Sequence, residues 1–398
     1  MATDHSWQSD TSGMATDRAY ARTGISFAPS WKSAVAEVTA DVMCGATSPP
    51  DLLVTFISSA WNDHFPTLIS EIREHTGGSC LIGSSSSGVI AGASCHESAP
   101  GITLMAMWLP GAVLSPLYLD APPQTWPWDA PIARENVRGI VLFSDPYHTD
   151  AQSTLIGLRV TCQGIPMIGG LASTGLDDRN AWVFLNDDVY ARGAVAVALE
   201  GPYDLLVRMS HGGTPVGEPW TMTSVQHNQI VTISNRPAIE VMNEALAEIA
   251  TRGFGSRDLM VGFPMDEYQD EFVREDFVAR GILDTNEESG AIMVGGIPRQ
   301  GQSVQFLLRD PYAASNDMYQ RLESLKQLQD VAVAGILSSC KGRGTSMFGR
   351  NDHDAQAVAK TLPDLPMIGL YSLGELAPVR DVPAYNAFAA ALGLILER

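Results

Sequence analysis

A short run near the C-terminal end of the chain, residues 338–344 (SSCKGRG), combines a thiol, two cations and two glycines. It follows an apolar stretch typical of a strand. Gly342 and Gly344 allow successive backbone N–H groups to turn toward one point, which is the geometry of an anion-binding nest. Lys341 and Arg343 add positive charge, and a guanidinium can hold a carboxylate with two hydrogen bonds. The run therefore predicts a site for the anionic group of a small ligand, with a purely structural turn as the alternative.

Cys340, in the middle of this run, is the candidate nucleophile. The two neighbouring cations would lower the pKa of its thiol and make it reactive. A cysteine nucleophile also needs a positioned base, and the next histidine in the sequence, His353, lies thirteen residues further on, at the expected start of a helix. We therefore expect a packed or ligand-contacting thiol. An enzyme that uses Cys340 on a small acyl-type substrate is the alternative.

Glu375 lies in a second apolar and glycine-containing stretch, residues 366–378. Its carboxylate can receive the ammonium group of a ligand or form an internal ion pair with Arg343, and the sequence leaves both open. An amino acid needs one anion site and one cation site, and Arg343 and Glu375 would supply them together. An amino acid or a small carboxylate is therefore the ligand class that we expect.

Two further turns carry hydroxyl groups and glycines. Residues 83–88 (GSSSSG) imitate a phosphate-binding loop but lack the Lys-Ser/Thr pair that grips nucleotide phosphates and magnesium, so a nucleotide site is disfavoured. Hydroxyl groups in these turns can bind a small polar ligand, or they can simply cap the strand ends. The candidate residues are Ser84, Ser85, Ser86, Gly169, Gly170 and Ser173. Because the second turn mirrors the first, we treat the two as one prediction.

Three segments must position these residues, and they share one layout: an apolar strand, a helical stretch and a second strand that ends in Ile-Gly. They span residues 52–92, 139–175 and 334–378. Continuous apolar runs on both sides of a helix are typical of parallel strands, and right-handed crossovers bring the carboxyl ends of such strands to one edge. Ligands bind at that edge in α/β sheets. We expect an α/β fold whose mixed sheets are built around β-α-β units, with helices covering the sheets.

We divide the chain into three regions. We expect a disordered tail over residues 1–26, an α/β domain over 27–225 and a second α/β domain over 226–398. The tail has no apolar segment of the kind found in signal peptides. It contains the tetrapeptide MATD at Met1 and again at Met14, which raises the hypothesis that translation can start at Met14.

The composition excludes several classes of protein. The 398 residues contain 25 Lys and Arg against 45 Asp and Glu, a formal net charge of −20. This charge repels phosphate backbones and anionic lipids, so we expect neither nucleic acid nor membrane as a partner. Five cysteines without a CxxC pair indicate neither a zinc site nor a disulfide framework, and they suit a reducing cytoplasm. We therefore expect a cytoplasmic protein without a metal.

Several motifs together resemble the FIST family, in which an N-terminal and a C-terminal FIST domain occur together. The matching motifs are IGSSSSGVIAG, IGGLASTG, GGTPVGEPWTMT, RPAIEVMNEAL, GGIPRQGQSV and, most specifically, SCKGRGTSMFGRN followed by IGLYSLGELAP. The resemblance covers about residues 30–396. It implies a cytoplasmic sensory module that binds small molecules, amino acids being the favoured suggestion, and that acts in signal transduction. We expect the output to come from a separate histidine kinase or another signalling protein.

The resemblance also implies a third alternative. Some FIST-like proteins are described as haem-dependent nitric oxide sensors, so a haem gas sensor stands beside the ligand sensor and the enzyme. The sequence contains no CxxCH motif for haem attachment and no HExxH motif for a metal. We expect a binding protein rather than an enzyme, with no bound cofactor.

Overall fold

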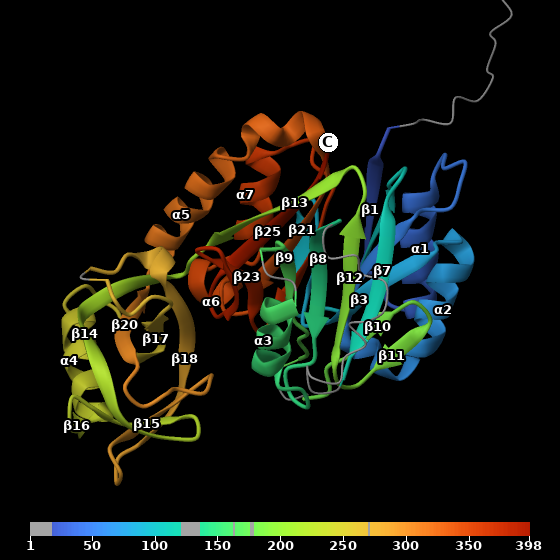
Figure 1. Ribbon diagram of the computed structural model, residues 1–398. Helices are drawn as coiled ribbons and strands as arrows, with labels where there is room; N and C mark the ends of the chain where they lie inside the picture. Colours follow the sequence, from blue (N-terminus) through green and yellow to red (C-terminus); the bar gives the residue numbers. More distant parts are fainter. Residues whose placement is uncertain (1–17, 121–135, 162–163, 176–178, 270) are drawn as a thin grey trace, which may run out of the picture.

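The computed structural model describes residues 18–120, 136–161, 164–175, 179–269 and 271–398 (Figure 1). The fold is mixed α/β, as expected, with four sheets. Three sheets form a body, and the fourth forms a separate lobe of residues 213–309 (Figure 1). Most of the expected N-terminal tail, including Met1 and Met14, lies outside the described residues. Residues 20–26, which we also placed in the tail, form a strand instead, because they pair in register with β6.

The first sheet has the strand order β1-β6-β2-β3-β10-β11. The bounds in this order are Tyr20–Ser26, Ile102–Trp108, Leu52–Ser58, Cys80–Ser86, Val183–Leu185 and Asp188–Tyr190. β2 and β3 run parallel and are joined by η1 (Ser59–His64) and α2 (Phe65–Thr76), whereas the other pairs are antiparallel. Together with α1 (Trp31–Met43), α2 packs on the outer face of this sheet.

The second sheet has the strand order β24-β23-β9-β8-β12-β7. The bounds in this order are Val382–Asn386, Glu375–Val379, Met167–Leu171, Val137–Ser144, Ala194–Glu200 and Val113–Leu119. β8 and β9 run parallel and are joined by α3 (Ala151–Thr161), which packs on the outer face. Two of the strands, β23 and β24, come from the C-terminal part of the chain, so this sheet contains segments distant in sequence.

The third sheet has the strand order β13-β25-β21-β22-β4-β5. The bounds in this order are Tyr203–Ser210, Ala390–Glu397, Ala332–Cys340, Met367–Ser372, Val89–Ala91 and Ser94–His96. β21 and β22 run parallel and are joined by α6 (Gly344–Phe348) and α7 (His353–Thr361). Helix α7, α5 (Pro311–Glu323) and η5 (Lys326–Val331) cover the outer face. Asp310 caps α5, and Pro311 is its first residue.

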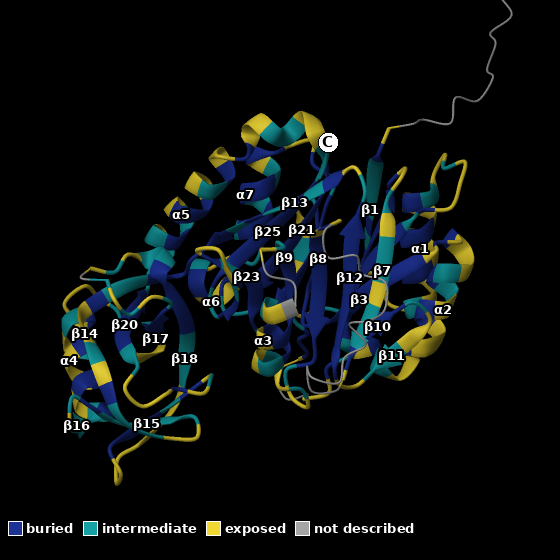
Figure 2. Ribbon diagram, viewed as in Figure 1, coloured by how far each residue is buried: buried dark blue, intermediate teal, exposed yellow. Residues whose placement is uncertain are grey.

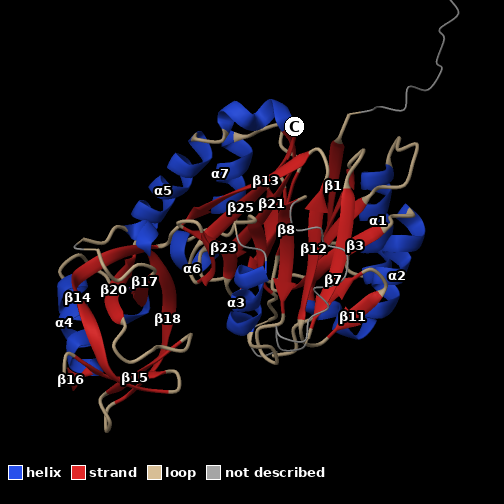
Figure 3. Cartoon of the chain, viewed as in Figure 1, coloured by secondary structure: helices blue, strands red, loops and turns tan. Residues whose placement is uncertain are grey.

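The inner faces of the three body sheets share one core. Val54 of β2, Phe143 of β8 and Ile336 of β21 all belong to it, and the next residue on β2, Leu53, packs instead under the outer helices. Side chains alternate between the two faces of a strand, so a strand covered on both faces reads as a continuous apolar run. Figure 2 shows most strands of the body buried and the outward helix surfaces exposed, with the edge strand β7 partly exposed, and Figure 3 shows the helices outside the sheets.

The lobe is an antiparallel sheet that is covered by one α-helix. Its strand order is β14-β20-β17-β18-β19-β15-β16, with bounds Gly213–Gln226, Ser303–Arg309, Leu259–Pro264, Phe277–Asn286, Ala291–Val294, Gln229–Ile233 and Arg236–Pro237. The short helices η3 (Ser256–Asp258) and η4 (Arg274–Asp276) lie in its loops, and α4 (Ala238–Ala250) packs on its core. The chain enters the lobe from β13 and leaves it into α5.

The domain boundary that we expected near residue 225 falls inside β14. The sheets of the body contain strands from before and after residue 225, since β4 pairs with β22 and β9 pairs with β23. The closing segment is strand β25, and residues 102–119 contain the two strands β6 and β7, which lie in different sheets. Among the described residues, no helix is both long enough and apolar enough to cross a membrane.

Candidate functional site

The carboxyl ends of the three parallel strand pairs meet at one place in the body. The backbone N–H of Ser87 donates to Ser173 Oγ at 2.8 Å, and Ser173 Oγ donates to the carbonyl oxygen of Tyr371. The N–H of Tyr371 in turn donates to Ser86 Oγ at 3.1 Å. The turns after β3 and β9 and the end of β22 are therefore in direct contact, as the common layout of the three segments predicts.

The remaining residues of the first two turns are also buried here. Ser85 Oγ accepts a hydrogen bond from the N–H of Trp182 at 3.0 Å, and the fully buried Ser84 Oγ has no hydrogen-bond partner in the part of the chain that the structure describes. A Cβ at Gly169 would lie 1.7 Å from the carbonyl oxygen of Leu142, and one at Gly170 would lie 2.6 Å from a serine Oγ. Close packing therefore requires both glycines.

Arg343 is fully buried and is held by Asp354. Its Nε and Nη2 donate to the two carboxylate oxygens at 2.8 and 2.9 Å, and Ser339 Oγ and His353 Nδ1 bond the same carboxylate. Burial opposes ionisation of Asp354, but Arg343 and His353 hold the pKa of this carboxyl well below its usual range. Of the two alternatives that the sequence left open for Glu375, the ion pair with Arg343 is therefore not formed, and the counterion of the Arg343 guanidinium is Asp354.

The backbone of the 340–344 turn also has an internal partner. The N–H of Thr345 donates to Glu97 Oε1 at 2.7 Å, and a Cβ on Gly344 would overlap that same oxygen. The N–H of Gly342 donates to Cys340 Sγ at 3.4 Å, and Lys341 Nζ donates to the carbonyl oxygen of residue 174 at 2.9 Å. A carboxylate of the protein thus takes the place at this turn that we expected for a ligand anion.

Cys340 lies in surroundings that oppose its reactivity. Its side chain is buried, and burial together with the nearby Glu375 raises the pKa of the thiol far above its ordinary value. The candidate base His353 bonds Asp354 through Nδ1 and Ser315 Oγ through Nε2. A protonated thiol is a weak nucleophile, so this geometry disfavours the enzyme alternative.

Glu375 is a fully buried carboxyl at the start of β23. Oε1 accepts from Ser372 Oγ at 2.6 Å, and Oε2 accepts from the N–H of Ala389 at 3.0 Å. Burial raises the pKa of Glu375 to about 8, although these two hydrogen bonds favour the charged form. At neutral pH this carboxyl is mostly protonated, and it forms no ion pair within the described ranges.

Two polar side chains near Glu375 were missed by the sequence analysis. Asn386 pairs with Glu375 across β23 and β24, and its Nδ2 has no partner among the described residues although the residue is buried. Arg280 projects from β18 of the lobe, and burial lowers the pKa of its guanidinium to about 10, with Glu375 acting against that shift. The signal that could have found Arg280 is a single cation inside the apolar strand FVARGIL.

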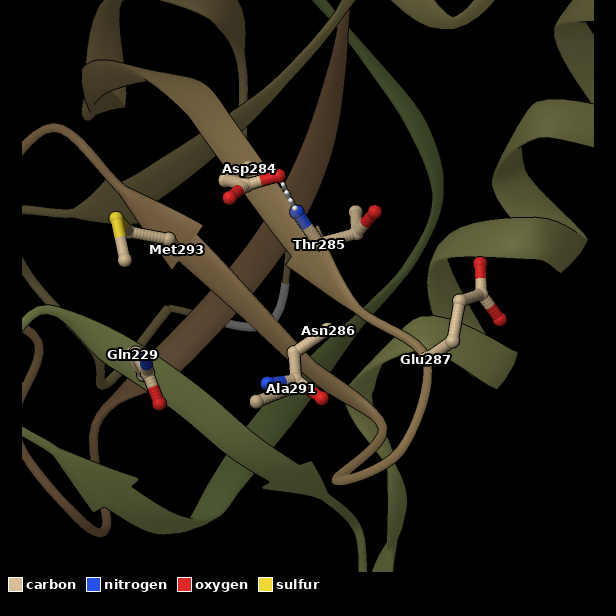
Figure 4. A pocket seen from close by; sticks show the side chains of 7 residues that line it. All are labelled: Gln229, Asp284, Thr285, Asn286, Glu287, Ala291 and Met293. Atoms are coloured by element: carbon tan, nitrogen blue, oxygen red, sulfur yellow. Dashed lines mark hydrogen bonds between the residues drawn. The ribbon is translucent and has the colours of Figure 1, made fainter.

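Two cavities lie away from the strand ends. One, of about 340 Å³, lies in the lobe and is lined by polar side chains that include Asp284, Asn286 and Glu287 (Figure 4). The other, of about 410 Å³, lies between η4 and α5 and includes Arg274 and Asp317. Neither contains a residue that we predicted for the site. Within the described ranges, no group of His, Cys, Asp and Glu side chains is placed to hold a metal ion.

Comparison with known proteins assigns the class. The FIST N domain model matches residues 51–236 and the FIST C domain model matches residues 238–378. The chain therefore belongs to the FIST family, whose domains are sensory domains in signal transduction.

Two mycobacterial proteins are similar to this chain over most of their length. An uncharacterized protein of Mycobacterium tuberculosis strain H37Rv is 29% identical over 394 residues, which cover 94% of this chain and 99% of the relative. An uncharacterized protein of Mycobacterium bovis is 26% identical over 364 residues, which cover 88% of this chain and 92% of the relative. The similarity thus includes the body and the lobe together.

Proposed function

We propose that this protein is a sensory protein that binds an amino acid or a small carboxylic acid and transmits the binding event to a separate partner. Membership of the FIST family supports the sensory role. The meeting of three parallel strand ends supports a small-molecule site there, because ligands of α/β sheets bind beyond the carboxyl ends of strands. The buried serines at this place supply hydroxyl groups for a polar ligand.

The observation that carries the proposal is the environment of Glu375. A fully buried carboxyl group that forms no ion pair costs free energy, and burial keeps Glu375 protonated although the charge of Arg343 acts in the opposite direction. An ammonium group brought beside it would allow it to ionise and would gain an ion pair in a medium of low dielectric constant. Glu375 is therefore the cation site of the proposed amino-acid ligand.

The lobe offers a route from binding to signalling. The chain passes between body and lobe before β14 and after β20. The two parts also contact each other, for example where Asn386 Oδ1 accepts from the N–H of Ala279 at 3.2 Å and where Arg380 forms an ion pair with Asp276. A ligand shifts an equilibrium only if its affinity differs between two conformations. A ligand held between Glu375 and the lobe would favour one lobe position, which a histidine kinase or another signalling protein would recognise.

The cell compartment that suits this role is the cytoplasm. The described cysteines are all free thiols, namely Cys44, Cys80, Cys95 and Cys340. Free thiols persist in a reducing compartment, which supports a cytoplasmic location for the proposed sensor.

A thermal-shift screen tests the proposal. The probes are the twenty amino acids, short carboxylic acids and short amines, each tested with wild type and with Glu375→Gln. A ligand at a hundred times its dissociation constant adds about 2.7 kcal/mol to the native state, which raises the midpoint by a few degrees. We expect some amino acids to stabilise the wild type and to lose most of this effect in Glu375→Gln.

The control variant is Glu200→Gln, which removes a buried carboxyl at the end of β12, away from β23. It should keep the wild-type response. A panel without any stabilising compound, or equal shifts in Glu375→Gln and wild type, would contradict the proposed function.

A further inference from the structure

We propose that the guanidinium group of Arg280 binds the carboxylate of the ligand at the junction between the lobe and the body. The inference rests on the proposed function, because it assigns the anion site that Arg343 cannot provide. Arg280 lies on β18 of the lobe, whereas Glu375 lies on β23 of the body. One amino acid bound to both would therefore connect the two parts of the molecule.

The hydrogen bonds of Arg280 leave one edge of its guanidinium unused. Nη1 donates to the carbonyl oxygen of Ala279 at 2.9 Å and to that of Tyr385. Nε and Nη2 donate to no atom of the described residues, and Arg280 forms no ion pair with them. Nε and Nη2 are the two atoms that Arg343 uses to hold the carboxylate of Asp354. The free edge of Arg280 thus has the geometry for bidentate binding of a carboxylate.

The charge of Arg280 lacks compensation at neutral pH. Burial lowers its pKa to about 10, so the guanidinium stays positively charged. The acid that acts on it is Glu375, and burial raises the pKa of that carboxyl to about 8, so it is mostly neutral at pH 7. A cation that is partly removed from water without a counterion attracts an anion. This favours a negatively charged group of a ligand beside Arg280.

The glycine turn after β19 leaves room beside the free edge. A Cβ at Gly296 would lie 3.0 Å from Arg280 Nε and 3.3 Å from its Cδ, so any larger side chain there would crowd the guanidinium. The N–H of Gly295 donates to the carbonyl oxygen of Gly281 at 3.0 Å, which fixes the turn against β18. Because the Arg280 side chain is only partly buried, a ligand can reach it from solvent.

Asn386 supplies an independent indication of a ligand. It follows Tyr385, whose carbonyl oxygen accepts from Arg280, and it stands opposite Glu375 in the β23–β24 pair. Its Oδ1 accepts from the N–H of Ala279, but the buried Nδ2 has no partner within the described ranges. A buried donor without an acceptor costs about 1–3 kcal/mol. A ligand carboxylate shared between Arg280 and Asn386 would satisfy it.

The first test measures affinity by calorimetry. The titrant is the amino acid that most stabilises the wild type, and the variants are Arg280→Gln, Gly296→Val and Arg208→Gln. Arg208 is the matched control, because it is a partly buried arginine whose Nη1 also donates to a backbone carbonyl, on β13. We expect at least tenfold weaker binding in Arg280→Gln, weaker binding in Gly296→Val, which keeps the arginine, and wild-type binding in Arg208→Gln. Unchanged affinity in Arg280→Gln overturns the inference while leaving the proposed function in place.

The second test does not depend on a known ligand. Sodium acetate is titrated into wild-type protein labelled with ¹⁵N-arginine, and the Nε–Hε resonance of Arg280 is identified by its loss in Arg280→Gln. We expect acetate to shift this resonance but not that of Arg208, whereas ethylammonium chloride at equal ionic strength should leave it in place. If no compound of the thermal-shift panel stabilises the protein in a Glu375-dependent way but acetate shifts Arg280, the anion site stands and the proposed function fails. If acetate leaves the resonance unchanged, the anion site is refuted.

Discussion

Replacing Glu375 by Gln should change how the stability of the protein depends on pH. The pKa of this carboxyl rises from an ordinary value of 4.5 to about 8 on folding, because burial penalises the charged form. The folded state then binds more protons than the unfolded state between these two values. Linkage requires stability to be full below about pH 4.5 and to fall as the pH rises toward 8.

The size of the effect follows from the shift. Each pKa unit corresponds to about 1.4 kcal/mol, so this group lowers the free energy of unfolding by up to about 5 kcal/mol between pH 4.5 and 8. Gln resembles the protonated acid, since its oxygen can accept from the N–H of Ala389 while its amide donates to Ser372 Oγ. Glu375→Gln should therefore lose less stability than wild type over this range.

The assay is urea denaturation of wild type, Glu375→Gln and the control Glu200→Gln at pH values from 5 to 8.5. As the pH rises, we expect the free energy of unfolding of Glu375→Gln to increase by several kcal/mol relative to that of wild type. Glu200→Gln should follow the wild-type profile, because Glu375 still titrates in it. Parallel profiles for wild type and Glu375→Gln would refute the assignment of a neutral buried carboxyl.

Four further outcomes follow from the same contacts. Asp354→Asn leaves a buried guanidinium without its counterion and should lower the free energy of unfolding, measured by urea denaturation, by about 3–5 kcal/mol. A variant that unfolds at the same urea concentration as wild type would contradict this expectation. Gly169→Ala should prevent stable folding, because its methyl group would lie 1.7 Å from a backbone oxygen, whereas Gly175→Ala, with no atom within 4 Å, should melt like wild type. The thiol of Cys340 should resist iodoacetamide in the native protein while the exposed Cys44 reacts, as peptide mass spectrometry would show. Protein purified from haem-supplemented cells should show no Soret band, and a stoichiometric band would favour the gas-sensor alternative.

The central strands of the body could be predicted because both of their faces are covered. The runs 52–58 and 102–108 coincide with β2 and β6, since every residue in them is buried against either the common core or the outer helices. The same pattern could not reveal that three sheets share one core. Pairings such as β4 with β22 join residues far apart in the sequence, and local patterns carry no information on them.

The sequence could predict which turns lie together, but it could not predict the ion pairs around them. The turns after β3, β9 and β21 are in contact, because each follows a strand of a parallel pair and the three sheets that contain these pairs pack around one core. The partner of Arg343 could not be predicted, because Asp354 reaches it from the following helix, across a loop without a regular period. Arg280 was missed for a related reason. It is a candidate site residue because the Nε and Nη2 edge of its guanidinium has no partner among the described residues, and only the arrangement of the lobe and the body reveals this.

The most direct test of the account is to compare one amino acid with its two truncated forms by calorimetry. The three titrants are the best-binding amino acid, the corresponding carboxylic acid without the amine, and the corresponding amine without the carboxylate. Because Arg280 and Glu375 each bind one end of the ligand, we predict that the amino acid binds at least tenfold more tightly than either truncated form. Equal affinity of all three compounds, or binding of none, would contradict the account.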